Sequence, residues 1–228
     1  MKSSSRSSRR PPASGDDLWI PRSIRSSLER SLRVRTDLRD RLAEDARDLR
    51  RGSQNAMREM HRGHDGKMLL RRLTPQARRV IPYAASREAG VVDDALQEWT
   101  EAHLLSAFLR GESPPAPGDL GVPAETYLAG VGDLVGEVRR LVLGDLTRGD
   151  LARATERFGA MEGLFHFLLA FESPRSILAL KPRQDSARSL VERTRSELAL
   201  ARILSRAVPP GAGAPVHEMT TGAPGEVP

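Results

Sequence analysis

Leucine and alanine recur at helical spacing over the first third of the chain, and this pattern restricts the possible folds more than any other feature. Steps of three, four, six and seven residues bring the members to one side of an α-helix. The stripe consists of Leu28, Leu32, Leu38, Leu42, Ala46, Leu49, Ala56 and Met60. Arginine and aspartate fill the other positions. We therefore expect a helix over residues 22–61, with a kink or a break at Gly52.

The same reasoning predicts helices through most of the remaining chain. No segment alternates apolar and polar residues over the length of a strand. Aromatic residues make up only 4% of the chain, so a core must be built from Leu, Ala and Val, which suits packed helices. The expected helices span residues 67–86, divided at Thr74–Pro75, then 91–110, 123–146, 150–172, a short piece near Ile177, and 184–207.

These helices predict an all-α protein, a single-domain bundle of six or seven helices over residues 21–207. Residues 1–20 are rich in Ser, Arg and Pro, and residues 208–228 are rich in Pro and Gly, so both ends are expected to be disordered. The loop 112–121 is also rich in Pro and Gly. The apolar run 165–171 is too short to cross a membrane and is interpreted as a buried helix segment that includes His166. We expect a cytoplasmic protein.

Positive charge is concentrated near the start of the chain. Residues 1–79 contain 21 Lys and Arg against 10 Asp and Glu, whereas the remainder carries a net charge of −5. Nearly all of these cations are arginines, whose guanidinium groups match phosphate oxygens two at a time. A phosphate-rich partner, RNA or DNA, is the leading interpretation. The alternative is a solvated basic face that only maintains solubility.

Two pairs of acidic residues lie within otherwise apolar helices. Glu98 and Glu101 are three residues apart, and Asp133 and Glu137 are four apart, so each pair shares one face of its helix. Clustered carboxylates repel each other and persist when a cation neutralises them. With no cysteine in the chain, the ligands must be oxygen or imidazole, and an all-oxygen site suits Mg²⁺ or Mn²⁺. The alternative is that these acids face solvent or pair with arginines.

At these same helices the sequence resembles the translin/Trax family. The resemblance rests on segment 96–102 (LQEWTEA), on segment 127–141 (YLAGVGDLVGEVRRL) and on the Gly149–Asp150 that follows, and it extends more weakly over about residues 25–205. It implies a translin-like helical fold and, because the acidic set is that of Trax, a metal-dependent endoribonuclease. It also implies a closed octameric shell, formed by this chain alone or together with a translin-like chain.

The resemblance also implies roles for individual residues. Glu98, Glu101 and Asp133 match the catalytic acids of Trax, and Glu137 matches a further acid that helps to hold the metal ion. Arg140 matches a family arginine on the same helix. Translin itself binds nucleic acid without the full acidic set, so a non-catalytic protein that binds RNA or single-stranded DNA is the alternative.

The leading hypothesis is therefore an endoribonuclease that acts on short or structured RNA with Mg²⁺ or Mn²⁺. Exposed arginines would hold the phosphate backbone without reading bases. The arginines expected to do so are Arg33, Arg35, Arg39, Arg71, Arg72 and Arg140. A third possibility is a helical assembly protein whose arginines pair with its own acids.

Overall fold

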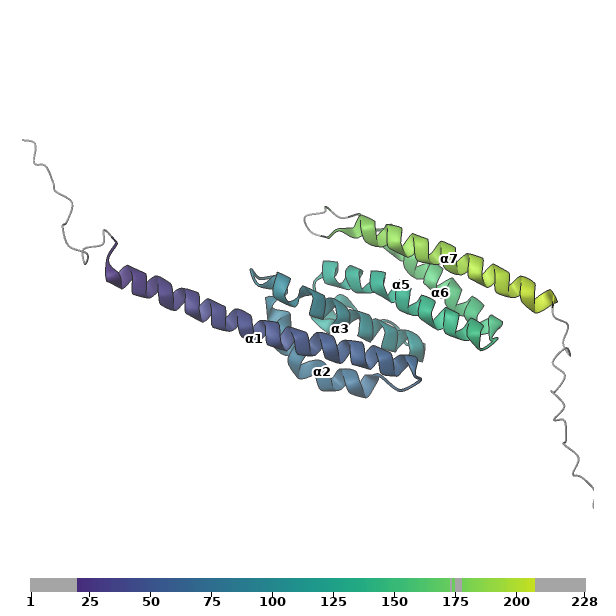
Figure 1. The fold of residues 1–228 in the computed structure, drawn as a ribbon, viewed down its shortest axis with the longest axis horizontal. Coiled ribbons are helices and arrows are strands. Elements are labelled where there is room, and N and C mark those ends of the chain that lie inside the picture. Colours follow the sequence, from purple (N-terminus) through teal and green to yellow (C-terminus); the bar gives the residue numbers. More distant parts are fainter. Residues whose placement is uncertain (1–19, 173, 175–177, 208–228) are drawn as a thin grey trace, which may run out of the picture. The chain divides into compact units, whose positions relative to one another are not determined.

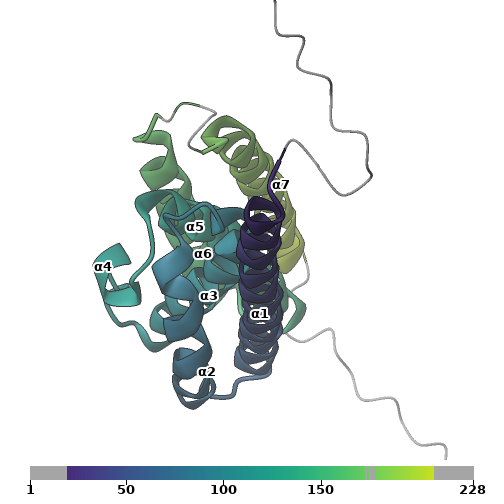
Figure 2. The same cartoon turned by 90° about the vertical axis from the view of Figure 1, so that its left-hand side faces the viewer.

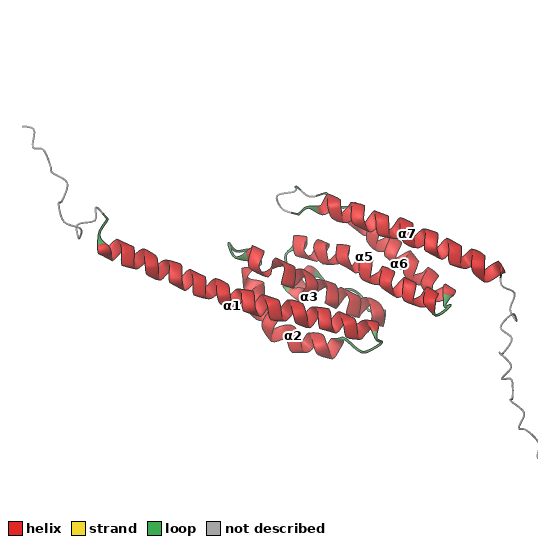
Figure 3. Cartoon of the chain, in the orientation of Figure 1, coloured by secondary structure: helices red, strands yellow, loops and turns green. Residues whose placement is uncertain are grey.

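The computed structural model describes residues 20–172, 174 and 178–207, and over these residues the protein is helical without a strand (Figure 3). The predicted all-α class is confirmed. The tails predicted at 1–20 and 208–228, apart from Ile20, and the short piece near Ile177 lie outside the described residues.

The described residues form seven α-helices and one short 3-10 helix (Figure 1). In chain order these are α1 (Arg22–His61), α2 (Lys67–Val80), the 3-10 helix η1 (Ile81–Tyr83), α3 (Ala89–Arg110), α4 (Pro117–Leu120), α5 (Ala124–Thr147), α6 (Leu151–Leu169) and α7 (Leu180–Ala207). Contacts divide the chain into two compact units, described separately below. Among the described residues, the first unit comprises 20–102 and 116–126, and the second comprises 103–115, 127–172, 174 and 178–207.

In the first unit α1 packs along α2, and the two helices lie side by side in both views (Figure 1, Figure 2). The apolar stripe of α1 is buried from Leu42 onward, as the helical spacing predicted. The expected break at Gly52 is wrong, because α1 is one helix of 40 residues. A Cβ at Gly52 would lie only 2.3 Å from Cδ2 of Leu73, so this glycine admits the neighbouring side chain of α2.

The N-terminal half of α1 continues the same stripe without a covering element among the described residues. Ile24, Leu28 and Leu32 are 48%, 58% and 66% exposed. Near the middle of the helix, Arg35 and Arg39 contact the buried carboxylate of Glu88, at 2.9 and 3.5 Å. The ion pairs of α1 with Glu88 thus lie near the middle of the helix, whereas its first turns expose an apolar face.

Two boundaries in the first unit differ from the prediction. Pro75 lies inside α2 and does not divide it. Both Pro75 and Arg71, whose carbonyl loses its helical donor, are exposed, so water can satisfy that carbonyl. The Pro- and Gly-rich loop also contains one helical turn, α4, which ends at Gly121 with φ +69°.

In the second unit α6 packs along α7. The side chain of Asp150 accepts a hydrogen bond from the backbone N–H of Arg153 and caps α6, at the position where the sequence predicted this helix to begin. At the other end of α6, Gln184 Nε2 of α7 donates to the carbonyls of Leu168 and Phe171 at 2.8 and 3.0 Å. This glutamine therefore ties the start of α7 to the backbone at the end of α6.

Only two of the seven residues in the run 165–171 are buried, so the prediction of a buried segment is wrong for the other five. Phe165 and Leu168 face the core, whereas Phe167, Leu169 and Phe171 are 45%, 39% and 37% exposed. His166 is also exposed, contrary to the expectation of a core histidine. The reason is helical periodicity, because residues three apart share a face while their neighbours point elsewhere.

Candidate metal and nucleic-acid site

The first acid pair lies on α3 within the first unit. Trp99 and Ala102 beside it are buried, and Glu101 itself is 7% exposed. Glu98 is half-buried, and its Oε1 accepts a hydrogen bond from Gln54 Nε2 of α1 at 2.8 Å. Nε of Arg50, one turn earlier on α1, lies 3.6 Å from the same oxygen. The acids therefore occupy a largely apolar helix, as predicted, and one of them is held by polar groups of α1.

The second acid pair lies on α5 within the second unit. Asp133 and Glu137 are both half-buried, and Leu134 between them is buried. Oδ1 of Asp133 accepts a hydrogen bond from Nη1 of Arg183, on α7, at 3.0 Å. Gly132, next to Asp133, lies beside the stem of Arg183. A Cβ there would lie 3.7 Å from Cβ and Cδ of Arg183.

The donor atoms of the two pairs fit a hard divalent cation, because all of them are carboxylate oxygens. Each pair shares one face of its own helix. Within the described ranges, however, no three His, Asp or Glu side chains are arranged to hold a metal ion. The pairs belong to different units, so a site with all four acids stays a prediction.

The residues that hold these acids were missed by the sequence reasoning. Arg50 and Gln54 are four apart on α1, which places them on one face, but that spacing alone does not identify a partner. Arg183 carries no local signal, because its contact with Asp133 joins residues 50 positions apart.

The predicted phosphate-binding arginines divide into two groups. Arg35 and Arg39 contact Glu88, yet their side chains are 54% and 62% exposed. The other four, which are Arg33, Arg71, Arg72 and Arg140, are exposed. These exposed guanidinium groups are available to a phosphate-rich ligand.

His103 lies two residues beyond Glu101. Burial, with a smaller contribution from the nearby charge of Arg110, lowers the pKa of His103 from 6.5 to about 4. The imidazole is therefore neutral at neutral pH. In that state it adds no positive charge for a phosphate group.

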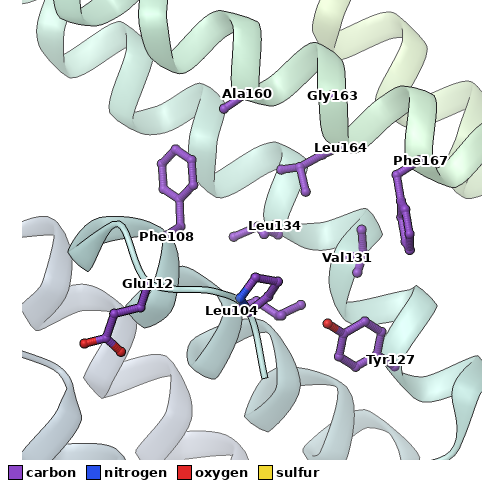
Figure 4. A pocket seen from close by; sticks show the side chains of 11 residues that line it. Leu104, Phe108, Glu112, Tyr127, Val131, Leu134, Ala160, Gly163, Leu164 and Phe167 are labelled. Atoms are coloured by element: carbon purple, nitrogen blue, oxygen red, sulfur yellow. The ribbon is translucent and has the colours of Figure 1, made fainter. Parts of the chain in front are cut away.

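The second unit also contains an apolar cavity of about 420 Å³ (Figure 4). Its wall is formed by Leu104, Phe108, Glu112, Pro114, Tyr127, Val131, Leu134, Ala160, Gly163, Leu164 and Phe167. Glu112 is the only acid in this wall, and none of the four predicted acids lines the cavity. The cavity is therefore distinct from the predicted metal site.

Comparisons with known proteins place the fold. No family model matches the chain. An uncharacterized protein of Methanocaldococcus jannaschii is 26% identical over 166 residues, which are 71% of this chain and 75% of that protein.

None of the described helices is long and apolar enough to cross a membrane.

Three solved structures share the helical architecture. The complex of AfC3PO with duplex RNA is 25% identical, with a TM-score of 0.73, and the match covers 80% of this chain and 98% of that one. A crystal structure of AfC3PO is 24% identical, with a TM-score of 0.70 and coverages of 78% and 97%. Apo-NeC3PO is 20% identical, with a TM-score of 0.70 and coverages of 77% and 96%.

The fold is thus the all-helical fold seen in C3PO, the translin–Trax complex. The chain is translin/Trax-like in fold, and the resemblance noted in its sequence is confirmed.

Proposed function

We propose that this protein is a metal-dependent endoribonuclease that cleaves short or structured RNA. The observation that carries the proposal is the presence of two acid pairs on largely buried helices, Glu98 with Glu101 on α3 and Asp133 with Glu137 on α5. Carboxylates paired on one face of a helix repel each other, and a bound cation relieves that repulsion. The complex of AfC3PO with duplex RNA, a structural neighbour, further supports RNA as the ligand.

The four acids would hold Mg²⁺ or Mn²⁺, which when bound activates water and polarises a phosphoryl oxygen. The chain's own residues bind and orient the RNA. Exposed arginines such as Arg33, Arg71 and Arg140 attract the phosphate backbone without selecting a sequence. RNA of many sequences would therefore be cleaved, with shape and length as the main determinants.

The test is cleavage of labelled RNA in Mg²⁺ by the wild type, Glu101→Gln and Asp133→Asn. Each variant removes one carboxylate charge, and we expect losses of about 100-fold or more, equivalent to about 3 kcal/mol of transition-state stabilisation. Glu192→Gln is the matched control, because Glu192 is an exposed acid of α7 outside the site. Equal cleavage by all four proteins would contradict the proposal.

Assembly is part of the proposal. Ile24, Leu28 and Leu32 continue a stripe that is buried further along α1, and an apolar face of this length is normally covered by another subunit. The shell would consist of this chain alone or of this chain with a translin-like partner, in an octamer. Light scattering of the purified chain, with and without such a partner, measures which assembly forms.

The second candidate function is binding of RNA or single-stranded DNA without catalysis. Its specific support is that Glu98 and Asp133 already have polar partners on neighbouring helices and so need no metal ion for charge balance. This candidate predicts nucleic-acid binding that EDTA does not change, without cleavage products. Both candidates predict a steep loss of affinity as salt rises.

A further inference from the structure

Arg183 reaches from the first turns of α7 to the predicted metal-binding face of α5. Its Nη1 donates to Oδ1 of Asp133 at 3.0 Å and lies 3.5 Å from the carbonyl oxygen of Ala129, one turn earlier on α5. The stem of Arg183 lies against Gly132, where a Cβ would be 3.7 Å from its Cβ and Cδ. These are ordinary van der Waals distances, so the stem of Arg183 packs directly beside the backbone that carries Asp133.

The first unit has a corresponding arrangement around Glu98. Its carboxylate accepts a hydrogen bond from Gln54 and lies 3.6 Å from Nε of Arg50. In each unit, one acid of the predicted pair is thus held by a cationic side chain from a different helix. This recurrence matters because both acids are ones that the proposed function assigns to the metal ion.

We propose that Arg183 is a positioning residue that holds Asp133 while no divalent cation is bound and releases it when one binds. The inference rests on the proposed function, because it takes Asp133 to be a metal ligand. A carboxylate oxygen that accepts from a guanidinium is less available to a cation, so the two compete. The side chains of Arg183 and Asp133 are 29% and 37% exposed. An ion pair this open to water is weak enough for a divalent cation to displace the arginine from the carboxylate.

The competition has a direct consequence for metal affinity. Removing Arg183 removes the competitor, so the variant Arg183→Gln should bind Mn²⁺ about two- to fivefold more tightly than the wild type, the size expected for a partly exposed ion pair. Arg183→Met, which keeps the length of the stem, should do the same. A residue that only supports the fold would leave Mn²⁺ affinity unchanged or lower it.

The experiment is calorimetric titration of the full chain with Mn²⁺ in the absence of RNA. Lys181→Gln is the matched control, because Lys181 lies on the same turn of α7 but its Nζ pairs with Asp185 at 2.9 Å. We expect unchanged affinity in this control and a loss of about tenfold or more in Asp133→Asn. Melting temperatures give a second measurement: Arg183→Gln should melt below the wild type in EDTA, and saturating Mn²⁺ should remove that difference.

The outcomes separate the two proposals. If Asp133→Asn weakens Mn²⁺ binding while Arg183→Gln leaves it at the wild-type value or lowers it, the role given to Arg183 is wrong and the metal site stands. If Asp133→Asn binds Mn²⁺ as the wild type does, both the metal site and the role of Arg183 are overturned. Tighter binding by Lys181→Gln as well would indicate a general charge effect and would also overturn the role.

Discussion

Replacing Asp145 with asparagine should destabilise the corner between α5 and α6 more than any surface substitution. The Asp145 side chain is 1% exposed, and its two oxygens each accept from an arginine at 2.7 Å. One partner, Arg157, is itself only 12% exposed, whereas Arg148 is 65% exposed. Loss of the carboxylate therefore leaves the Arg157 guanidinium buried without its counter-charge.

The expected cost follows from these exposures. Breaking a buried ion pair from one side costs about 3–5 kcal/mol, so the free energy of unfolding of Asp145→Asn should fall by about that amount. Removing the exposed partner with Arg148→Gln should cost less than about 1 kcal/mol. The assay is urea denaturation followed by far-ultraviolet circular dichroism, with both variants measured beside the wild type.

A double variant tests whether the unpaired charge of Arg157 causes the loss of stability. Replacing a buried pair with apolar residues of similar volume is often neutral, so Asp145→Leu with Arg157→Met should lie within about 1 kcal/mol of the wild type. A double variant as unstable as Asp145→Asn would refute the explanation by an unpaired charge. In that case the geometry of the corner, and not an unpaired charge, would explain the loss.

Three further predictions concern other parts of the chain. Because the pKa of His103 is lowered to about 4, the unfolded chain binds more protons between that value and 6.5, so stability should fall by about 2 kcal/mol from about pH 7.5 to about pH 5, and denaturation of His103→Gln should show a smaller pH slope. Leu28→Glu should weaken self-association about tenfold or more in light scattering, whereas Ser26→Glu, on the opposite side of α1, should not. Gly52→Val should lower stability by about 1–3 kcal/mol in urea denaturation through the clash with Leu73, and Leu73→Ala in the same chain should recover part of it.

The long helices could be predicted because their signals are local. The first helix was expected over residues 22–61 and is found as Arg22–His61, since apolar spacing marks its whole length. Asp150 was expected to begin the helix over residues 150–172, and its side chain caps the first turn of α6. The acid pairs were placed on buried helices for the same reason, because the residues around them repeat at helical spacing.

The remaining errors and omissions depend on contacts between distant residues. Gly52 was expected to break α1, but it lies inside a continuous helix, and the nearby side chain of Leu73 explains why a glycine occupies this position. Pro75 was expected to divide α2, and only its exposure explains why the helix tolerates it. The contacts of Arg183 with Asp133 and of Gln54 with Glu98 join helices far apart in sequence. No local sequence pattern therefore predicts these contacts.

The central claim is that acids of α3 and α5 together bind a divalent ion. A crystal of the protein grown with Mn²⁺ and measured by anomalous scattering tests it most directly. We predict an anomalous peak about 2 Å from carboxylate oxygens of at least one of Glu98 and Glu101 and at least one of Asp133 and Glu137. A crystal without such a peak, or with Mn²⁺ bound only at other residues, would contradict the claim.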